Sequence, residues 1–564
     1  ISPGSVTKSE WQDGMMSDNT TRYNYITTNL MTNFSKTFGD FGLNLLLGTS
    51  TDNTSVKSTG LMGTHFIIPG FYSYNNVAKE DLRSLYQKSR KRLVGVYGEF
   101  RADWKSTVFL TVTGRNDWTS TLPKANRSYF YPSVSGAVVF TQFLQDHGWL
   151  GGDSFLTFGK IRASWAKVGK DTSPYETLTT LSPIGGFIGD MQGAGNSIQQ
   201  GNNLLKPEMT KSTEIGVELR FFNNRLKLDY AYYTNDSNNQ ILVPRTSQAT
   251  GFIKNSLNAG NVLNKGMELA ISGVPVQTKD WTWETSINMA GNRGRIENLV
   301  AGLDLLYLTD VQYGSAKAVS FNNGTFMAIG GTKWTRVPEG EHKGKVILDA
   351  KGMPSCDTNS TLEIANREPK FTGGWNNSLR WKDFTFNMLW EFSVGGAVFN
   401  GTKWKMTEYG TSQFSADVRQ QPLTIDGVVK LADGSYEERH YEYQPDQIYN
   451  YNGVPTLGYN IIKDYYTTYY PRETANYVTK VNSLRLRSIS LSYDVPRTLL
   501  AKTKAIKRAV VTASATNLLL FTNYDGDPEV AASGAGVGGS SSVGFDYCGV
   551  PATASFAFGI NLTF

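Results

Sequence analysis

The sequence predicts an all-β fold, a transmembrane antiparallel β-barrel, and three observations support this prediction. About fifteen segments alternate apolar residues with small or polar ones, which is the period of a strand. Short and long connections alternate between these segments, as periplasmic turns and extracellular loops do in outer-membrane barrels. The chain also ends on such a segment, 554–564, whose last residue is the aromatic Phe564.

The terminal segment shows the pattern most clearly. One of its two faces is wholly apolar and the other is small and polar, and about ten tilted residues are enough to cross a bilayer. In a soluble sheet the apolar face would turn to a core, whereas in a barrel it faces lipid. The predicted lipid-facing row of this closing strand is Phe556, Phe558, Ile560, Leu562 and Phe564.

The same alternation recurs along the whole chain. Asn223-Asn224 separates two alternating runs by two turn residues, which predicts a tight hairpin. In the repeated segments the charged residues occupy one face only. A soluble β-protein would have fewer charged residues alternating with so large an apolar face. The predicted strands are 23–34, 41–49, 93–102, 108–115, 130–140, 158–168, 214–221, 226–232, 265–273, 281–290, 371–380, 384–392, 484–493, 509–518 and 554–564.

The connections assign a direction to each strand. The short ones are 35–40, 103–105, 223–224, 274–280 and 381–383, and the long ones are 50–91, 116–129, 169–212, 235–263, 291–369, 394–482 and 519–553. Trp104, Trp281 and Trp381 lie at short turns, where an interfacial aromatic belt is expected. With short turns in the periplasm, the first and last strands both run downward. Because closed barrels of this kind have an even strand number, we expect at least one further strand upstream.

Composition agrees with a large β-protein. The 564 residues have a mean hydropathy of −0.33, 12% aromatic residues and 56 glycines, and no apolar run is long enough for a transmembrane helix. The net charge of +6 gives no support for nucleic-acid binding. The chain begins with Ile1 and a polar, loop-like stretch, 2–20, without a signal peptide. We therefore expect it to begin inside a larger protein.

Polar residues on the non-lipid face are expected to point into a lumen. They can pair across strands or contact whatever fills the lumen. These residues are Glu99, Arg101, Arg115, Arg162, Glu214, Glu218 and Arg220.

Several loop motifs each allow two interpretations. The aromatic loop residues Tyr465, Tyr466, Tyr469 and Tyr470, with Tyr449 and Tyr451 upstream, can contact a ligand or partner or pack within the loop. Lys88, Arg90, Lys91 and Arg92 form a basic outer rim that pairs with lipopolysaccharide phosphates or is simply solvated.

Asp525, Asp527 and Glu529 could hold calcium, but a fixed turn is favoured. Gly534–Gly539 resembles a phosphate-binding loop but lacks the strand and helix such a loop needs.

The remaining chemistry is sparse. Cys356 and Cys548 could form a disulfide in an oxidising envelope, although their spacing indicates no metal or redox motif. The four histidines lack zinc-type spacing. No set of residues suggests a nucleophile, a general base and an oxyanion site, so we predict no enzyme, no metal and no cofactor.

Several segments together resemble the SusC/RagA-like TonB-dependent transporters. Each motif alone is weak, but the set spans residues 90–564 and is specific. The motifs are Arg115-Asn-Asp117, Phe130-Tyr-Pro-Ser133, 160–169 (KIRASWAKVG), Leu205-Lys-Pro-Glu208, Glu214-Ile-Gly-Val-Glu218, Asn264-Lys-Gly-Met-Glu268, 484–493 (LRLRSISLSY) with Pro496, Asn517-Leu518 and 524–529 (YDGDPE).

The resemblance implies a 22-stranded barrel plugged by an N-terminal domain and covered by a SusD-class surface lipoprotein. Such proteins import oligosaccharides or peptides across the outer membrane of Bacteroidetes-type bacteria, driven by TonB. Residues 1–564 would then be the C-terminal fifteen or so strands with their extracellular loops. The plug, the TonB-contact segment and the first strands are expected to lie outside this chain. Outer-membrane lipid and lipopolysaccharide are the further expected partners.

Two other functions remain open from the residues alone. A complete smaller barrel would be a passive porin or a surface adhesin, and a soluble β-rich binding protein would need no membrane. Glycan and peptide importers share one scaffold and differ in loops and lumen, so the sequence leaves the substrate class open.

Overall fold

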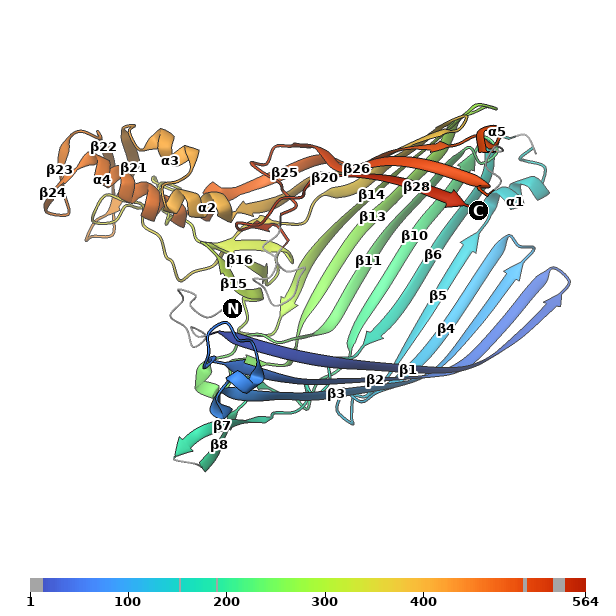
Figure 1. The fold of residues 1–564 in the computed structure, drawn as a ribbon, viewed down its shortest axis with the longest axis horizontal. Coiled ribbons are helices and arrows are strands. Elements are labelled where there is room, and N and C mark those ends of the chain that lie inside the picture. Colours follow the sequence, from blue (N-terminus) through green and yellow to red (C-terminus); the bar gives the residue numbers. More distant parts are fainter. Residues whose placement is uncertain (1–13, 152–153, 189–190, 501–504, 531–542) are drawn as a thin grey trace. The chain divides into compact units, whose positions relative to one another are not determined.

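The structure, a computed structural model, describes residues 14–151, 154–188, 191–500, 505–530 and 543–564 (Figure 1). One sheet contains fifteen strands in a continuous hydrogen-bonded order, which follows the order of the chain. This confirms the predicted all-β class and the predicted number of strands. In order, the strands are β1 (Met15–Phe38), β2 (Phe41–Thr64), β3 (Leu82–Trp104), β4 (Val108–Thr119), β5 (Ser128–Val138), β6 (Leu156–Lys170), β10 (Glu208–Phe221), β11 (Leu226–Leu242), β13 (Leu257–Gln277), β14 (Trp281–Leu299), β19 (Phe371–Trp381), β20 (Phe384–Asn400), β25 (Val478–Asp494), β26 (Arg508–Thr522) and β28 (Ser555–Thr563).

The strands extend beyond the predicted bounds, most of all near the N-terminus. β2 and β3 pair without interruption from Phe41 opposite Trp104 to Gly63 opposite Leu82. The predicted loop 50–91 is therefore wrong, and the connection between these strands is only 65–81. The apolar alternation stops where the side chains become Ser, Thr and Lys. The backbone ladder continues because its hydrogen bonds do not depend on that pattern.

Other boundaries differ by smaller amounts. The strand predicted to reach Phe140 ends at Val138, and a short helix α1 (Phe140–Asp146) follows. The predicted hairpin is confirmed, but its connection is 222–225 and not 223–224 alone; Asn223 and Asn224 have positive φ angles of 55° and 67°. Asparagine tolerates this left-handed conformation, which accounts for its place in the turn.

Smaller elements lie in the long connections. The first group is η1 (Tyr74–Asn76), η2 (Lys79–Asp81), β7 (Leu181–Ile188), β8 (Met191–Asn196), β9 (Gln199–Gln200), η3 (Gln248–Thr250) and β12 (Lys254–Asn255). A four-stranded sheet follows, made of β15 (Leu305–Tyr313), β16 (Ala316–Phe321), β17 (Ala328–Gly331) and β18 (Leu362–Asn366). Close to the end of the chain lie α5 (Arg497–Leu500) and β27 (Phe545–Asp546), which pairs with β20.

A separate folded body forms from the connection between β20 and β25 together with residues 332–356, which lie between β17 and β18. We call residues 332–356 and 401–477 the loop module. Figure 1 shows its helices and hairpins gathered beyond the ends of β20 and β25. Its elements are α2 (Gly401–Glu408), α3 (Gln413–Val418), β21 (Leu423–Lys430), β22 (Tyr436–Tyr443), β23 (Ile448–Tyr451), β24 (Val454–Leu457), α4 (Gly458–Asp464), η4 (Tyr465–Tyr469), η5 (Tyr470–Arg472) and η6 (Thr474–Tyr477).

The chain divides into two compact units. Unit 1 comprises 1–138, 163–213 and 237–260, and unit 2 comprises 139–162, 214–236 and 261–564. Unit 1 contains β1–β5, and unit 2 contains the loop module and β14–β28. The largest fully buried side chains of unit 2 include Phe399 and Phe545 at the end of β20. The buried apolar residues of unit 2 thus include the end of β20 and the short strand β27 that pairs with it.

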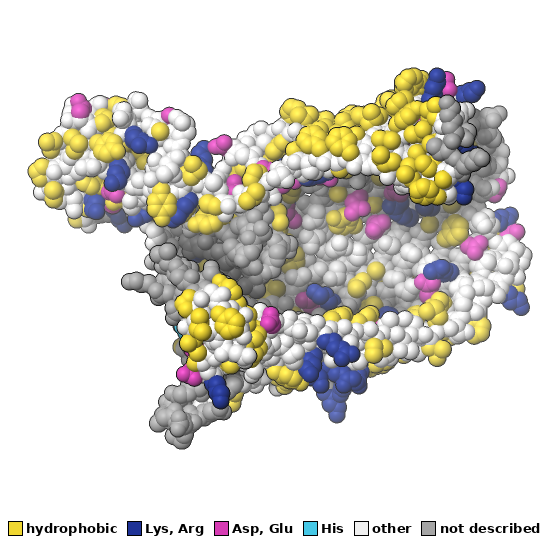
Figure 2. Space-filling model, in the orientation of Figure 1, with side chains coloured by type: hydrophobic (Ala, Val, Ile, Leu, Met, Phe, Trp, Pro, Cys, Tyr) yellow, Lys and Arg dark blue, Asp and Glu magenta, His cyan; other side chains and the backbone are white. Residues whose placement is uncertain are grey.

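Along the main strands, the apolar side chains are exposed. Val96 is 50% exposed on β3, and Phe558 is 86% exposed on β28. Figure 2 shows hydrophobic side chains gathered in a band over β26 and β28. Among the described residues, none of the helices has the length and apolarity that a membrane-crossing helix requires. We call the strand faces with these exposed rows the apolar face, and the opposite faces the polar face.

Aromatic residues mark the short turns. Trp281 and Trp381 stand opposite one another in the β14–β19 ladder, and their rings stack with centroids 5.6 Å apart. Trp104 ends β3 beside another short turn. Each of the three predicted tryptophans thus lies at the short-turn end of its own strand, where an interfacial aromatic belt is expected.

Candidate functional site

The polar face is held together by ion pairs along and across strands. Arg101 Nε donates to Glu99 Oε1 at 2.6 Å, and Arg115 Nε donates to Asp117 Oδ1 at 2.7 Å. Both pairs join neighbours on one face of a single strand, two residues apart. Arg115 also reaches Ser50 Oγ on β2 at 3.0 Å, so its guanidinium links strands.

A second group of the predicted residues forms two ion-pair clusters on β6, β10 and β11. Glu218 accepts from Lys160 Nζ at 2.7 Å and from Arg220 at 2.7 Å. Arg162 donates to Glu214 at 3.4 Å and forms two bonds to Asp229, at 2.8 and 3.2 Å. The structure therefore brings together Arg162 with Glu214, and Glu218 with Arg220, while Arg101 and Arg115 lie in further separate clusters. That these residues line a lumen stays a prediction.

The bond from Arg162 to Asp229 passes over an intervening strand. The sheet order is β6-β10-β11, so the guanidinium must cross β10. It crosses at Gly216, where an added Cβ would lie 2.6 Å from the guanidinium carbon of Arg162. The glycine is therefore needed for space, since such an approach is closer than any side chain tolerates.

A third, partly buried network lies where β25 meets the segment after β26. Arg485, 3% exposed, donates to Asp527 and to Glu529 Oε1, the latter at 3.2 Å. Arg487 donates to both carboxylate oxygens of Glu529, at 2.9 and 3.0 Å, and to Glu391 on β20. Arg487 lies at a register shift between Leu486 and Ser488, a β-bulge, and is the extra residue relative to β20.

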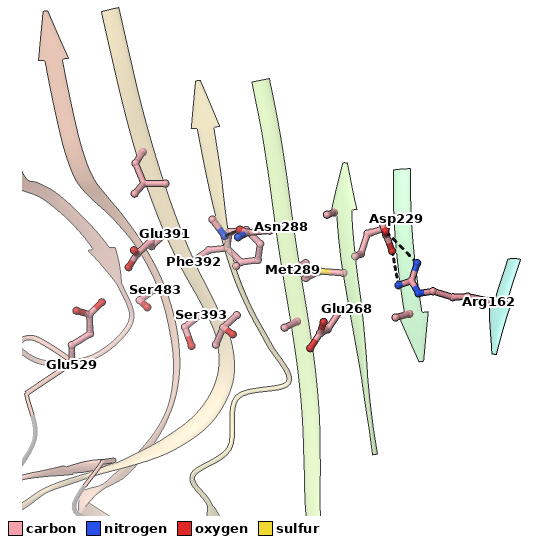
Figure 3. A pocket seen from close by; sticks show the side chains of 18 residues that line it. Arg162, Asp229, Glu268, Asn288, Met289, Glu391, Phe392, Ser393, Ser483 and Glu529 are labelled. Atoms are coloured by element: carbon pink, nitrogen blue, oxygen red, sulfur yellow. Dashed lines mark hydrogen bonds and ion pairs between the residues drawn. The ribbon is translucent and has the colours of Figure 1, made fainter. Parts of the chain in front are cut away.

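A cavity of about 900 Å³ opens on the polar face of unit 2. Figure 3 shows its charged lining residues, which come from five different parts of the chain. They are Arg162 and Asp229, bonded to one another, together with Glu268, Glu391 and Glu529. Asn288, Ser393 and Ser483 add amide and hydroxyl groups, and Met289 and Phe392 add apolar surface. The lining suits a polar, multiply hydrogen-bonded ligand.

The charge of this lining is unbalanced. Four carboxylates and one guanidinium face the cavity, although Arg487 compensates Glu391 and Glu529 from outside the lining. The side chain of Glu268 has no hydrogen bond or ion pair with any residue in the part of the chain that the structure describes. Its carboxylate is thus an available acceptor on the cavity wall.

The four predicted contact tyrosines lie inside the loop module. Tyr465 and Tyr469 are 9% and 6% exposed and pack with Ile461, Ile462 and Met353. Tyr466 and Tyr470 are half-buried, with ring centroids 5.6 Å apart. Burial raises the pKa of Tyr465, Tyr466 and Tyr470 above the ordinary value. The structure thus places these rings in the core of the loop, and ligand contact by them stays a prediction.

Other loop predictions have definite outcomes. Asp527 and Glu529 are bound to arginines, so the fixed-turn interpretation of this segment describes it. Cys356 and Cys548 are free thiols, and burial raises the pKa of Cys356. The considered disulfide is therefore not formed. The loop Gly534–Gly539 lies outside the described residues.

Sequence reasoning missed Asp229, Glu268, Glu391, Arg485 and Arg487. For Asp229 and Glu268 the alternation within their strands was a usable signal, because each lies between apolar neighbours. Arg485 and Arg487 alternate with Leu484 and Leu486 and both bond to Glu529, so the period was a usable signal for them as well.

Comparison with known proteins identifies the fold. Residues 4–346 match the family described as "TonB dependent receptor-like, beta-barrel". The chain belongs to this family. The TonB-dependent receptor P3 of Formosa agariphila is 26% identical over 573 residues, 97% of this chain and 52% of that protein. The TonB-dependent receptor SusC of Bacteroides thetaiotaomicron is 22% identical over 495 residues, 84% of this chain and 44% of SusC.

The solved structure of the RagAB peptide transporter has the same fold. It superposes with a TM-score of 0.74 at 19% identity, covering all of this chain and 58% of that one. The chain thus spans about half the length of the relatives that it matches. As a SusC/RagA-like TonB-dependent receptor barrel, it is an outer-membrane protein.

Proposed function

We propose that the chain is the C-terminal barrel portion of an active importer of oligosaccharides or peptides. The cavity on the polar face of unit 2 carries this proposal. Its volume, about 900 Å³, and its wall of carboxylates, amides and hydroxyls fit a short polar oligomer better than an ion or an apolar compound. Glu268 offers an unpaired acceptor to hydroxyl, amide or ammonium groups.

We propose further that import needs partners and segments beyond this chain. The family supports a SusD-like lipoprotein as the outer lid and TonB as the source of work, acting through an N-terminal plug. The substrate is held between lid, loops and plug, and pulling on the plug opens the path. Selection then rests on different affinities of the open and closed states, and no chemical step is required.

The sheet edges support the expectation of additional strands. Among the described residues, β1 and β28 end the strand order, so each has one neighbour in the main sheet. Unpaired backbone groups in hydrocarbon cost several kcal/mol each, so a membrane barrel has no open edge. We propose that strands outside residues 1–564 pair with both edges.

Uptake experiments in the native bacterium test the proposal. The gene is deleted, complemented with the full-length protein, and growth is measured on single oligosaccharides and on peptides. We expect loss of growth on one class, restored by the full-length gene but not in a strain that lacks TonB. Affinity purification from native membranes in mild detergent should recover a surface lipoprotein. Growth independent of TonB would instead identify a passive porin, and unchanged growth on every substrate would contradict import.

A cavity variant gives a matched control. Glu268→Gln removes the unpaired charge from the cavity wall on β13. Glu284→Gln makes the same change on the neighbouring strand β14, outside the cavity lining. If the cavity binds substrate, only Glu268→Gln alters the affinity or the half-saturating concentration for uptake. Equal effects of the two substitutions would remove the cavity from the proposal.

A further inference from the structure

Five cations gather on one face of β1, β2 and β3. Arg22 lies directly opposite Lys57 in the β1–β2 ladder, and Lys57 lies directly opposite Lys88 in the β2–β3 ladder. Arg90 and Arg92 follow on the same face of β3, two and four residues further along. All five are exposed, and Figure 2 shows Lys and Arg side chains gathered over this part of the sheet.

This arrangement is unfavourable without a counter-charge. Like charges directly opposite one another in a sheet repel, and here three stand in one row across three strands. None of the five forms an ion pair with a carboxylate in the described ranges. The nearest acid on the same face of β1 is Asp18, four residues from Arg22, or about 13 Å along the strand.

Lys91, the remaining residue of the predicted basic rim, is paired with an acid. Lys91 points to the opposite face and donates to Asp171 at 2.5 Å. Asp171 also accepts from Thr119 and Thr121, at 2.6 and 3.1 Å. Lys91 is thus neutralised by the protein, and the five uncompensated cations are Arg22, Lys57, Lys88, Arg90 and Arg92. The basic rim of the sequence analysis is corrected in this respect.

The position of the cations along the strands matches a membrane surface. Below them on the same face lie the exposed apolar residues Val96 and Phe100, and then Trp104 at the short turn. Arg92 is twelve residues from Trp104, which is about 40 Å along the strand and about 30 Å along the normal for a usual tilt. That is the thickness of the hydrocarbon layer.

A second aromatic residue marks the same height. Trp118, 41% exposed on β4, lies opposite Val94, two residues below Arg92. Tryptophan concentrates at both membrane interfaces, so Trp104 and Trp118 bracket the apolar band. Arg92, Arg90 and Lys88 consequently rise into the layer of headgroups above it.

We propose that Arg22, Lys57, Lys88, Arg90 and Arg92 bind the phosphate groups of a lipid headgroup in the outer leaflet. Arginine binds phosphate oxygens through a planar fork and lysine as a point charge, so the row offers several bonds to one or two phosphates. Bound phosphate removes the repulsion between Arg22, Lys57 and Lys88. The site is independent of the proposed import, because it faces lipid and not the cavity.

Binding of lipid A to the full-length protein tests the proposal. The protein is purified in detergent and stripped of lipid, and binding is measured with phosphorylated lipid A, with dephosphorylated lipid A and with inorganic phosphate. The variant is Lys88→Gln with Arg90→Gln. The control is Lys36→Gln with Lys105→Gln, which removes the same charge at the opposite end of these strands.

We expect the variant to bind phosphorylated lipid A about tenfold more weakly, since each cation near an anionic surface contributes measurably. The control should bind it like the unchanged protein, and dephosphorylated lipid A should bind weakly to all three. Equal affinity of variant and control, or equal affinity for the two lipid A forms, would overturn the proposal. Inorganic phosphate that binds as tightly as the lipid would overturn the lipid as its source.

Discussion

Gly216 shows how one missing side chain positions a charged group on the neighbouring strand. Because β10 carries no Cβ at this point, the guanidinium of Arg162 lies flat across the strand and bonds to Asp229 on β11. Both residues line the cavity, so the glycine shapes the wall on which we place substrate binding.

Replacing this glycine should cost stability only through Arg162. In Gly216→Ala the arginine must leave its preferred rotamer, which lowers the free energy of unfolding by about 0.5–1.5 kcal/mol. In an Arg162→Ala background the same change should cost little, because the coupling is lost. Denaturant unfolding of the full-length protein in detergent measures both. Gly559→Ala, with open space around its Cβ, is the control, and an equal loss in both backgrounds would contradict this account.

The Arg485–Asp527 pair should matter far more than an exposed pair of the same type. Arg485→Ala leaves the buried Asp527 carboxylate uncompensated, which costs about 3–5 kcal/mol. Arg508→Ala breaks an exposed pair with Asp494, whose side chains are 64% and 41% exposed, and should cost less than about 1 kcal/mol. Denaturant unfolding measures the free energy of unfolding of both variants. Similar losses would show that burial does not determine the contribution of these ion pairs.

At the scale of elements, the loop module buries its apolar side chains, whereas the terminal strand β28 exposes them. The module buries aromatic rings such as Tyr465 and Tyr469 in its own core, as a small soluble domain does. β28 exposes every apolar side chain of its predicted row, with Phe558 86% and Ile560 70% exposed. We expect lipid to take the place of a protein core for the strand, and water to surround the module.

The module should loosen in alkali. Burial raises the pKa of Tyr443 to about 12, above its ordinary value near 10. The folded state therefore holds a proton that the unfolded state loses, so stability is full below pH 10 and falls as the pH rises towards 12. Near-ultraviolet circular dichroism follows the change, and Tyr443→Phe should reduce the loss. An identical pH profile in that variant would rule out Tyr443 as a contributor.

A charge on the apolar face of β28 should impair membrane insertion. Phe558→Arg places a cation against hydrocarbon and should lower the free energy of unfolding in lipid vesicles by about 2–4 kcal/mol. Ala557→Arg, on the opposite face of the same strand, should cost much less. If Ala557→Arg proved the more damaging, the assignment of the two faces would be wrong.

At the scale of the molecule, the open edges of β1 and β28 decide what the chain can do by itself. Neither edge has a second partner among the described residues of the main sheet. Hydrocarbon offers no hydrogen bonds to the unpaired backbone groups of either edge.

Residues 1–564 expressed alone should therefore fail to form a stable barrel, whereas the full-length protein should form one. Heat-modifiable migration on gels and protease resistance in outer membranes measure the assembled fraction. Stable insertion of 1–564 alone would show that β1 and β28 can close on one another or on a second copy.

The alternation of residues determined much of this protein without coordinates. Period-two patterning established the fold class, the fifteen strands and the exposed row from Phe556 to Phe564, because a strand assigns each side chain to a face by simple counting. The resemblance to the family came from sequence motifs such as 160–169, which can be recognised without knowing how the chain folds.

Only the tertiary structure decided which distant residues meet. The reach of Arg162 across Gly216, the bulge at Arg487 and the row Arg22–Lys57–Lys88 depend on sheet order and register. The burial of Tyr465 and Tyr469 depends on the loop core. Contacts between residues far apart in the chain depend on strand register and on side-chain packing. Neither can be predicted from the local alternation of residues.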